Sequence, residues 1–118
     1  GFLEHKKLLN SFCDYDLFIS HPIERDHIAE AFFMANMEAM SSGLPIITTD
    51  CGGVPFVVKD NAIVCNQMSI EDIVKSIEKL LTDKILFNKM SVKSRKYIED
   101  NFSHEIIVKK WREVFDEK

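Results

Sequence analysis

Short apolar runs that alternate with helical patterns constrain the fold of this chain more than any other feature. Three segments, LFI at residues 17–19, PIITTD at 45–50 and AIVCN at 62–66, are dominated by apolar or β-branched side chains. Strands with this continuous character are buried on both faces, which is typical of a parallel sheet. Helices between such strands cover the sheet from both sides. The sequence therefore predicts an α/β fold with a parallel sheet flanked by helices.

Five segments carry helical patterns, at residues 5–12, 31–40, 69–83, 84–102 and 103–115. Gly43 fits the left-handed position after a helix end, and Ser69 fits the first capping position of the next helix. Trp111 and Phe115 lie four residues apart on the last helix, and we expect them in the core. Three strands are few for an open sheet, so a partner completes the sheet or the chain is part of a larger protein.

Composition excludes several classes of function. The net charge is −4, from 15 Lys and Arg against 19 Asp and Glu, which argues against a nucleic-acid binder. The apolar runs are too short for a transmembrane helix, and the first residues lack the order of a signal peptide. The three cysteines are scattered, as expected of free thiols in a reducing cytosol. The four histidines are far apart and lack close Cys partners. The D-x-D pattern of Asp14 and Asp16 precedes a strand, whereas a metal site would need it at the strand's exit, so we expect neither metal nor cofactor.

Glu38 is unusual because the helix around it is apolar on nearly all sides. With Glu30 it forms an E-x7-E pattern, which separates the two residues by roughly 12 Å along a helix axis. That spacing suits the two ends of one extended ligand. Burial of a carboxylate is costly without hydrogen bonds. On these grounds a ligand-hydroxyl role and a structural hydrogen bond are equally good interpretations for Glu38, whereas Glu30 alone could simply complement the helix dipole.

The segment EAFFMANMEAMSSGLPIITTDCGG, residues 30–53, resembles a known motif. It is similar to the E-x-F-G…E-A-M-A-x-G-x-P-V-I pattern and Gly-Gly turn of retaining glycosyltransferases with the GT-B fold, glycosyltransferase family 4. The similarity continues through residues 69–83 and 101–111, and so covers nearly the entire chain. The resemblance implies a Rossmann-like fold and the nucleotide-sugar-binding, C-terminal part of such an enzyme. The implied substrate is a nucleoside diphosphate sugar, and the implied reaction is hexosyl transfer to a glycan or lipid-linked acceptor in polysaccharide biosynthesis.

The resemblance also implies roles for individual residues. The second Glu of the motif holds the ribose hydroxyls, which implies that role for Glu38, and the first Glu approaches the donor sugar, which implies a catalytic role for Glu30. Backbone amides at the helix start receive the diphosphate, which implies Phe32, Phe33 and Met34.

Strand exits supply further candidates for the rim of the donor site. Ligands of parallel α/β sheets bind beyond the carboxyl ends of the strands. His21 follows the first strand, and the Gly52–Gly53 turn follows the second. We therefore expect these three residues at the rim.

Two departures from the motif support an alternative function. Phe33 stands where the family usually has Gly, and Phe56 where Glu is common. The alternative is a degenerate, non-catalytic module that acts in assembly, with Phe33 and Phe56 filling the former phosphate cleft.

We expect residues 1–118 to form one partial domain, with C-terminal helices over about 69–116. The N-terminal acceptor domain of a full enzyme is missing from this chain, so the 118 residues alone should be inactive. An exposed sheet edge would allow a homo-oligomer. The expected location is the cytoplasm. Contact with the inner surface of the membrane is a minority interpretation. That contact would use a basic run, for which a solvated helix face is the commoner explanation: Lys84, Lys89, Lys93, Arg95 and Lys96.

Overall fold

The computed structural model describes residues 2–26 and 34–116. Its three strands, β1 (Phe18–Ile19), β2 (Ile46–Thr49) and β3 (Ile63–Cys65), form one sheet in the order β1-β2-β3. Both pairings are parallel, with Phe18 opposite Ile46 and Ile47 opposite Ile63. The predicted parallel α/β fold is therefore confirmed.

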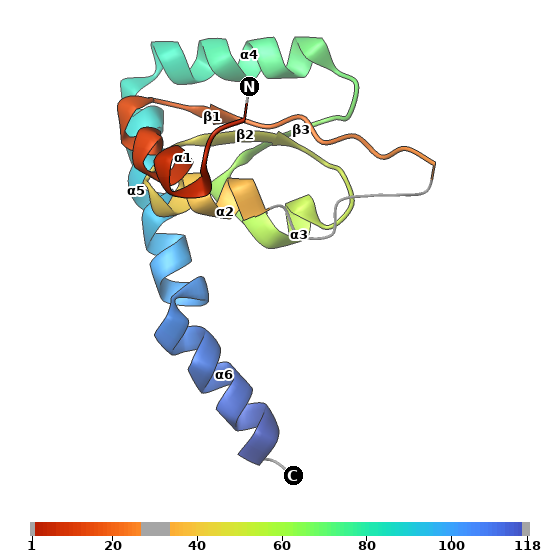
Figure 1. Ribbon diagram of the computed structural model, residues 1–118. Coiled ribbons are helices and arrows are strands. Elements are labelled where there is room, and N and C mark those ends of the chain that lie inside the picture. The colour runs from red at the N-terminus through yellow and green to blue at the C-terminus, as the bar shows by residue number, and fades with distance from the viewer. Residues whose placement is uncertain (1, 27–33, 117–118) are drawn as a thin grey trace.

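The helices alternate with the strands and then run in series to the C-terminus (Figure 1). In chain order, and with two short 3-10 helices included, they are α1 (His5–Ser11), η1 (Phe12–Asp14), α2 (Met34–Ser41), α3 (Val54–Val58), η2 (Lys59–Asn61), α4 (Ile70–Thr82), α5 (Lys84–Phe102) and α6 (His104–Asp116). The sequence did not predict α3. Its five residues carry three valines, which favour strands, but a proline at the first turn suits a helix start.

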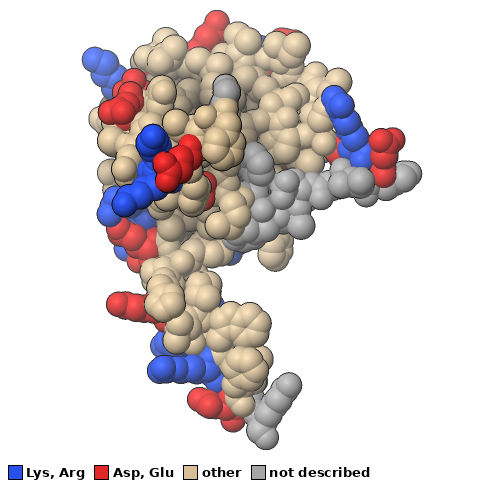
Figure 2. Space-filling view, viewed as in Figure 1, with Lys and Arg blue, Asp and Glu red and all other residues tan. Residues whose placement is uncertain are grey.

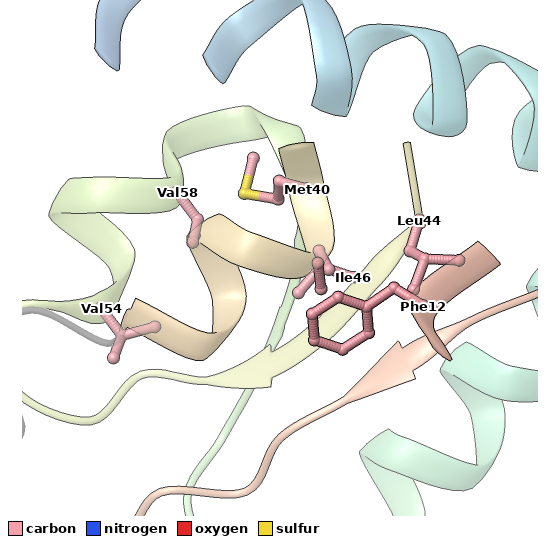
Figure 3. Close-up of a cluster of buried hydrophobic side chains, with 7 residues drawn as sticks. Phe12, Met40, Leu44, Ile46, Val54 and Val58 are labelled. Atoms are coloured by element: carbon pink, nitrogen blue, oxygen red, sulfur yellow. The ribbon is translucent and has the colours of Figure 1, made fainter. Parts of the chain in front are cut away.

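Helices cover both faces of the sheet, as the continuous apolar strands require. In Figure 1, α4 lies on one side of the strands, and α2 and α3 lie on the other. Neighbouring residues of β2 pack on opposite faces of the sheet, because successive side chains of a strand point to opposite faces. Ile46 packs with Met40 and Val58 in one cluster (Figure 3), whereas Ile47 packs with Leu80 in the other. β2 is therefore the shared centre of both cores, and all four of its residues are buried.

Two predicted helix boundaries are confirmed by their hydrogen bonds. Gly43 has a φ of 78°, and the N–H groups of Gly43 and Leu44 donate to the carbonyls of Met40 and Ala39. This is the Schellman pattern, which requires a left-handed residue and so favours glycine. At the start of α4, the Ser69 hydroxyl accepts a hydrogen bond from the backbone N–H of Asp72.

The expectation that Trp111 and Phe115 lie in the core is wrong. Their exposed fractions are 59% and 65%, and the two rings stack on each other with centroids 5.8 Å apart. Figure 1 shows the reason, since α6 extends away from the sheet and its flanking helices. No residue of α6 is buried. The predicted helix is present, but only its first turns pack against α5, so Ile106, Ile107 and Val108 are half-buried while Trp111 and Phe115 stay exposed.

Ion pairs account for much of the basic run on α5. Lys93 pairs with Asp60 at 2.5 Å, Arg95 with Glu99 at 2.8 Å and Lys96 with Asp100 at 2.9 Å. The hydrogen bond and charge of Lys93 hold the pKa of Asp60 below its ordinary value, and Asp100 raises the pKa of Lys96 in the same way. In the view of Figure 2, acidic and basic side chains are interspersed. This pattern favours the solvated-face interpretation. Over residues 2–26 and 34–116, no helix combines the length and apolar character needed to cross a bilayer.

Leu80→Ala should lower the free energy of unfolding by about 2–5 kcal/mol, because it leaves a cavity in a core that the sheet and α4 share. Leu80 is 1% exposed, whereas its neighbour Leu81 is 68% exposed. Leu81→Ala is therefore the matched control, with an expected change within about 0.5 kcal/mol. Urea unfolding measures both. Equal losses for the two variants would contradict the assignment of Leu80 to the core.

Candidate functional site

The carboxyl ends of the three strands meet at one edge of the sheet, because all strands are parallel. His21 follows β1, and the turn with Gly52 and Gly53 follows β2. The Thr49 hydroxyl, at the end of β2, donates a hydrogen bond to the carbonyl of Pro22. This contact ties the exits of β1 and β2 together. The predicted rim residues therefore lie at the strand edge where parallel sheets bind ligands.

The two glycines of the rim differ in what their backbone requires. Gly52 has a φ of 50°, in the left-handed region that favours glycine. Gly53 precedes α3 with a φ of −81°, which any residue adopts. Gly52 alone is thus required by the geometry of the turn. His21 is exposed.

A glutamine that the sequence did not single out joins the third strand exit to the other two. The backbone N–H of Gln67 donates to Asp50 Oδ1 at 2.9 Å, and Gln67 Oε1 accepts from the backbone N–H of Glu24 at 2.6 Å. Next to it, hydrogen bonds from the side chain and backbone of Asn66 hold the pKa of Asp72 below its ordinary value. The loops after all three strands are therefore connected by hydrogen bonds.

Beneath the rim, a buried polar cluster fixes α2 on the sheet. Ser20 Oγ donates to Asn36 Oδ1 at 2.8 Å and lies 2.9 Å from Thr48 Oγ1, while Asn36 Nδ2 donates to Thr48 Oγ1 at 3.3 Å. Asn36 is 1% exposed and Thr48 is fully buried. Because unpaired polar groups are costly in such a place, the three side chains hold the end of β1, β2 and α2 in one arrangement. A single Asn in an apolar helix was the only signal in the sequence.

Glu38 lies at the border of the buried face of α2, not inside it. Its side chain is 21% exposed, and its Oε1 lies 2.7 Å from Nε2 of His5 on α1. The helix around Glu38 is largely buried, as its apolar sequence suggests, with Asn36, Met37, Ala39 and Met40 turned to the interior. The Glu38 carboxylate itself is not fully buried. His5 could not be found from the sequence, since 33 residues separate the partners.

A shallow cavity of about 320 Å³ borders Glu38. Its walls come from α2, α5 and α6, and the lining residues are Met34, Met37, Glu38, Ser41, Ile98, Phe102 and Ile107. Among the described residues of this lining, Glu38 is the one ionisable group. The volume is at the lower end of the range for small-molecule sites. Two of the predicted donor residues, Met34 and Glu38, thus face the same space.

Three predicted site residues, Glu30, Phe32 and Phe33, lie outside the described residues. Met34, the first described residue of α2, is 57% exposed. Among residues 2–26 and 34–116, the hydrogen bonds do not connect Glu38 with His21 or with the Gly52–Gly53 turn. The structure therefore shows two groups of candidate residues, one at the strand exits and one on α2.

The described part of the chain contains no group of three or more His, Cys, Asp or Glu side chains placed to hold a metal ion. Asp14 and Asp16, which imitate a D-x-D metal motif, are both exposed and precede β1. The expectation that the site needs no metal stays a prediction.

Comparison with known proteins identifies the family. The model of the glycosyl transferases group 1 family matches residues 1–98. An uncharacterized glycosyltransferase of Haemophilus influenzae is 38% identical over 66% of this chain and 23% of its own length. One component of the human phosphatidylinositol N-acetylglucosaminyltransferase is 33% identical over 69% of this chain and 16% of its own. N-acetyl-alpha-D-glucosaminyl L-malate synthase of Bacillus anthracis is 28% identical over 73% and 23%. The chain thus spans less than a quarter of each of these relatives.

Asn36→Ala should lower the free energy of unfolding by about 1–3 kcal/mol, because it removes two hydrogen bonds of the buried cluster and leaves Ser20 and Thr48 incompletely paired. Ser41→Ala is the control, since Ser41 is exposed on the same helix. Urea unfolding with both variants measures the difference. Indistinguishable midpoints would show that the cluster does not fix α2.

Proposed function

This chain belongs to the glycosyl transferases group 1 family, and we propose that it forms the donor-binding part of a retaining glycosyltransferase of family 4, with the GT-B architecture. The family match over residues 1–98 carries this proposal. The donor is a nucleoside diphosphate sugar, and the sugar passes to an acceptor while the nucleoside diphosphate departs.

Glu38 binds the ribose of the donor in this proposal. A carboxylate accepts hydrogen bonds from hydroxyl groups, and that of Glu38 is partly exposed beside a cavity. Glu30 contacts the donor sugar, and the backbone amides of Phe32, Phe33 and Met34 stabilise the diphosphate as charge develops on it. His21, Gly52 and Gly53 form the rim. The roles of Glu30, Phe32, Phe33 and Met34 follow from the family motif, and those of His21, Gly52 and Gly53 follow from their position after the strands.

The transferred sugar is a hexose, and N-acetylglucosamine is the first candidate. Two relatives, one human and one from Bacillus anthracis, have an N-acetylglucosaminyl group in their names. A third, sulfoquinovosyl transferase SQD2 of Arabidopsis thaliana, names a different sugar. The acceptor is a glycan or a lipid-linked molecule of polysaccharide biosynthesis.

Residues 1–118 form a partial domain in this proposal, and the acceptor-binding domain lies outside them. The reaction takes place in the cytoplasm, at the inner membrane surface where the acceptor is lipid-linked, and without a metal or other cofactor. Self-association would use the outer edges of β1 and β3, where Ile19 and Val64 are 42% and 37% exposed.

A second candidate is the non-catalytic assembly module. It required Phe56 to fill a former phosphate cleft, yet Phe56 is 85% exposed. Phe33 lies outside the described residues. The described side chains therefore favour the donor-binding function.

Titration with UDP, GDP, ADP and CMP tests the proposal. One diphosphate should raise the melting temperature of the chain, because a ligand that binds only the folded state stabilises it. Glu38→Gln should abolish most of that rise, since an amide oxygen is a weaker acceptor for ribose hydroxyls. Glu71→Gln on α4 is the control, because Glu71 is exposed and pairs with Lys75. An unchanged melting temperature with all four nucleotides would favour the assembly module.

The 118 residues alone should transfer no sugar, because the acceptor-binding domain supplies half of the reaction site. The measurement is release of nucleoside diphosphate from the donor, and transfer of labelled N-acetylglucosamine to lipid extracts. Sugar transfer above the level of a heat-denatured control would show that residues 1–118 do not need the acceptor-binding domain for activity.

A further inference from the structure

We propose that His5 is a positioning residue for Glu38, holding one carboxylate oxygen so that the other is presented to the ribose hydroxyls of the nucleotide. This inference rests on the proposed function, because it concerns the same carboxylate. His5 itself does not contact the ligand in this arrangement. It acts through the orientation of Glu38.

The fold of α1 directs His5 toward α2. Leu8 lies three residues after His5, and Phe12 lies four residues after Leu8, so the three side chains share one face of the helical segment. Phe12 is 5% exposed and packs in the cluster that contains Ala39 and Met40 of α2, and Leu8 packs against this cluster. The apolar contacts therefore place α1 beside α2, and His5 reaches Glu38 at 2.7 Å.

The chemistry of the pair leaves one carboxylate oxygen for a ligand. A carboxylate only accepts hydrogen bonds, so Nε2 of His5 carries the proton in this contact. The bond engages Oε1. Among residues 2–26 and 34–116, it is the one hydrogen bond to the Glu38 carboxylate, and in the proposed arrangement Oε2 accepts from a ribose hydroxyl. Fixing a long side chain before the ligand arrives removes part of the entropy cost of binding.

A role in stability alone does not explain the pair. His5 is 68% exposed at its side chain, and exposed pairs of this kind contribute little to folding. None of the residues of α1 is buried, so a substitution at His5 leaves no cavity. Variants at this position should therefore fold, and their effect should be seen in ligand binding.

The test compares nucleotides that differ only in the hydroxyls that Glu38 would receive. UDP, GDP and ADP and their 2′,3′-dideoxy counterparts are titrated into wild type, His5→Ala, His5→Gln and Lys6→Ala by calorimetry. The preference for the ribonucleotide over its dideoxy counterpart should fall by about three- to tenfold in His5→Ala. Affinity for the dideoxy nucleotide should stay unchanged. His5→Gln should restore the preference, because its amide N–H reaches a similar position, and Lys6→Ala should match wild type.

Other outcomes overturn the inference in distinguishable ways. If wild type shows the preference and His5→Ala keeps it, His5 does not position Glu38, while the ribose role stands. Tighter binding by His5→Ala would mean that His5 competes with the ligand. An equal loss for both nucleotides of a pair would assign His5 a general structural role. If wild type binds no diphosphate, or shows no preference for the ribose hydroxyls, the ribose role and this inference both fail.

Discussion

The rest of the structure depends on one buried polar cluster, formed by Ser20, Asn36 and Thr48. These side chains lie where β1 ends, where α2 faces the sheet and in the middle of β2, and they satisfy one another by hydrogen bonds. Apolar contacts alone would allow α2 to rotate or slide, because they are not directional. Hydrogen bonds in a dry interior are directional, and leaving them unmade is costly. The cluster therefore fixes which side of α2 faces outward.

The orientation of α2 decides the chemical character of Glu38. With Asn36, Ala39 and Met40 turned inward, Glu38 falls at the border between core and solvent. There its carboxylate stays partly hydrated and accepts a hydrogen bond from His5. A rotation of the helix by one residue would bury the charge or expose it fully. The position of this carboxylate thus follows from packing against the sheet.

Much of the fold was predictable because its determinants are local. Continuous apolar strands, the left-handed Gly43 and the capping Ser69 act over a few residues, and each was confirmed. Two features were not predictable. The valines of α3 favour a strand, but the segment packs as a short helix with Val54 and Val58 buried. Trp111 and Phe115 have the spacing of a core face but are exposed, because burial depends on a neighbouring surface.

The sequence by itself determined the alternation of strands and helices, the parallel sheet and the motif that indicates the family. These features depend on periodicity and turn residues, which involve only residues close together in the chain. Only the tertiary structure decided which residues meet. His5 and Glu38 are 33 positions apart, and Gln67 joins loops that follow three different strands. Such contacts depend on how α1 and the strand exits are brought together by packing. No local pattern carries that information, because a hydrogen bond between distant residues forms only once the core has placed their backbones side by side.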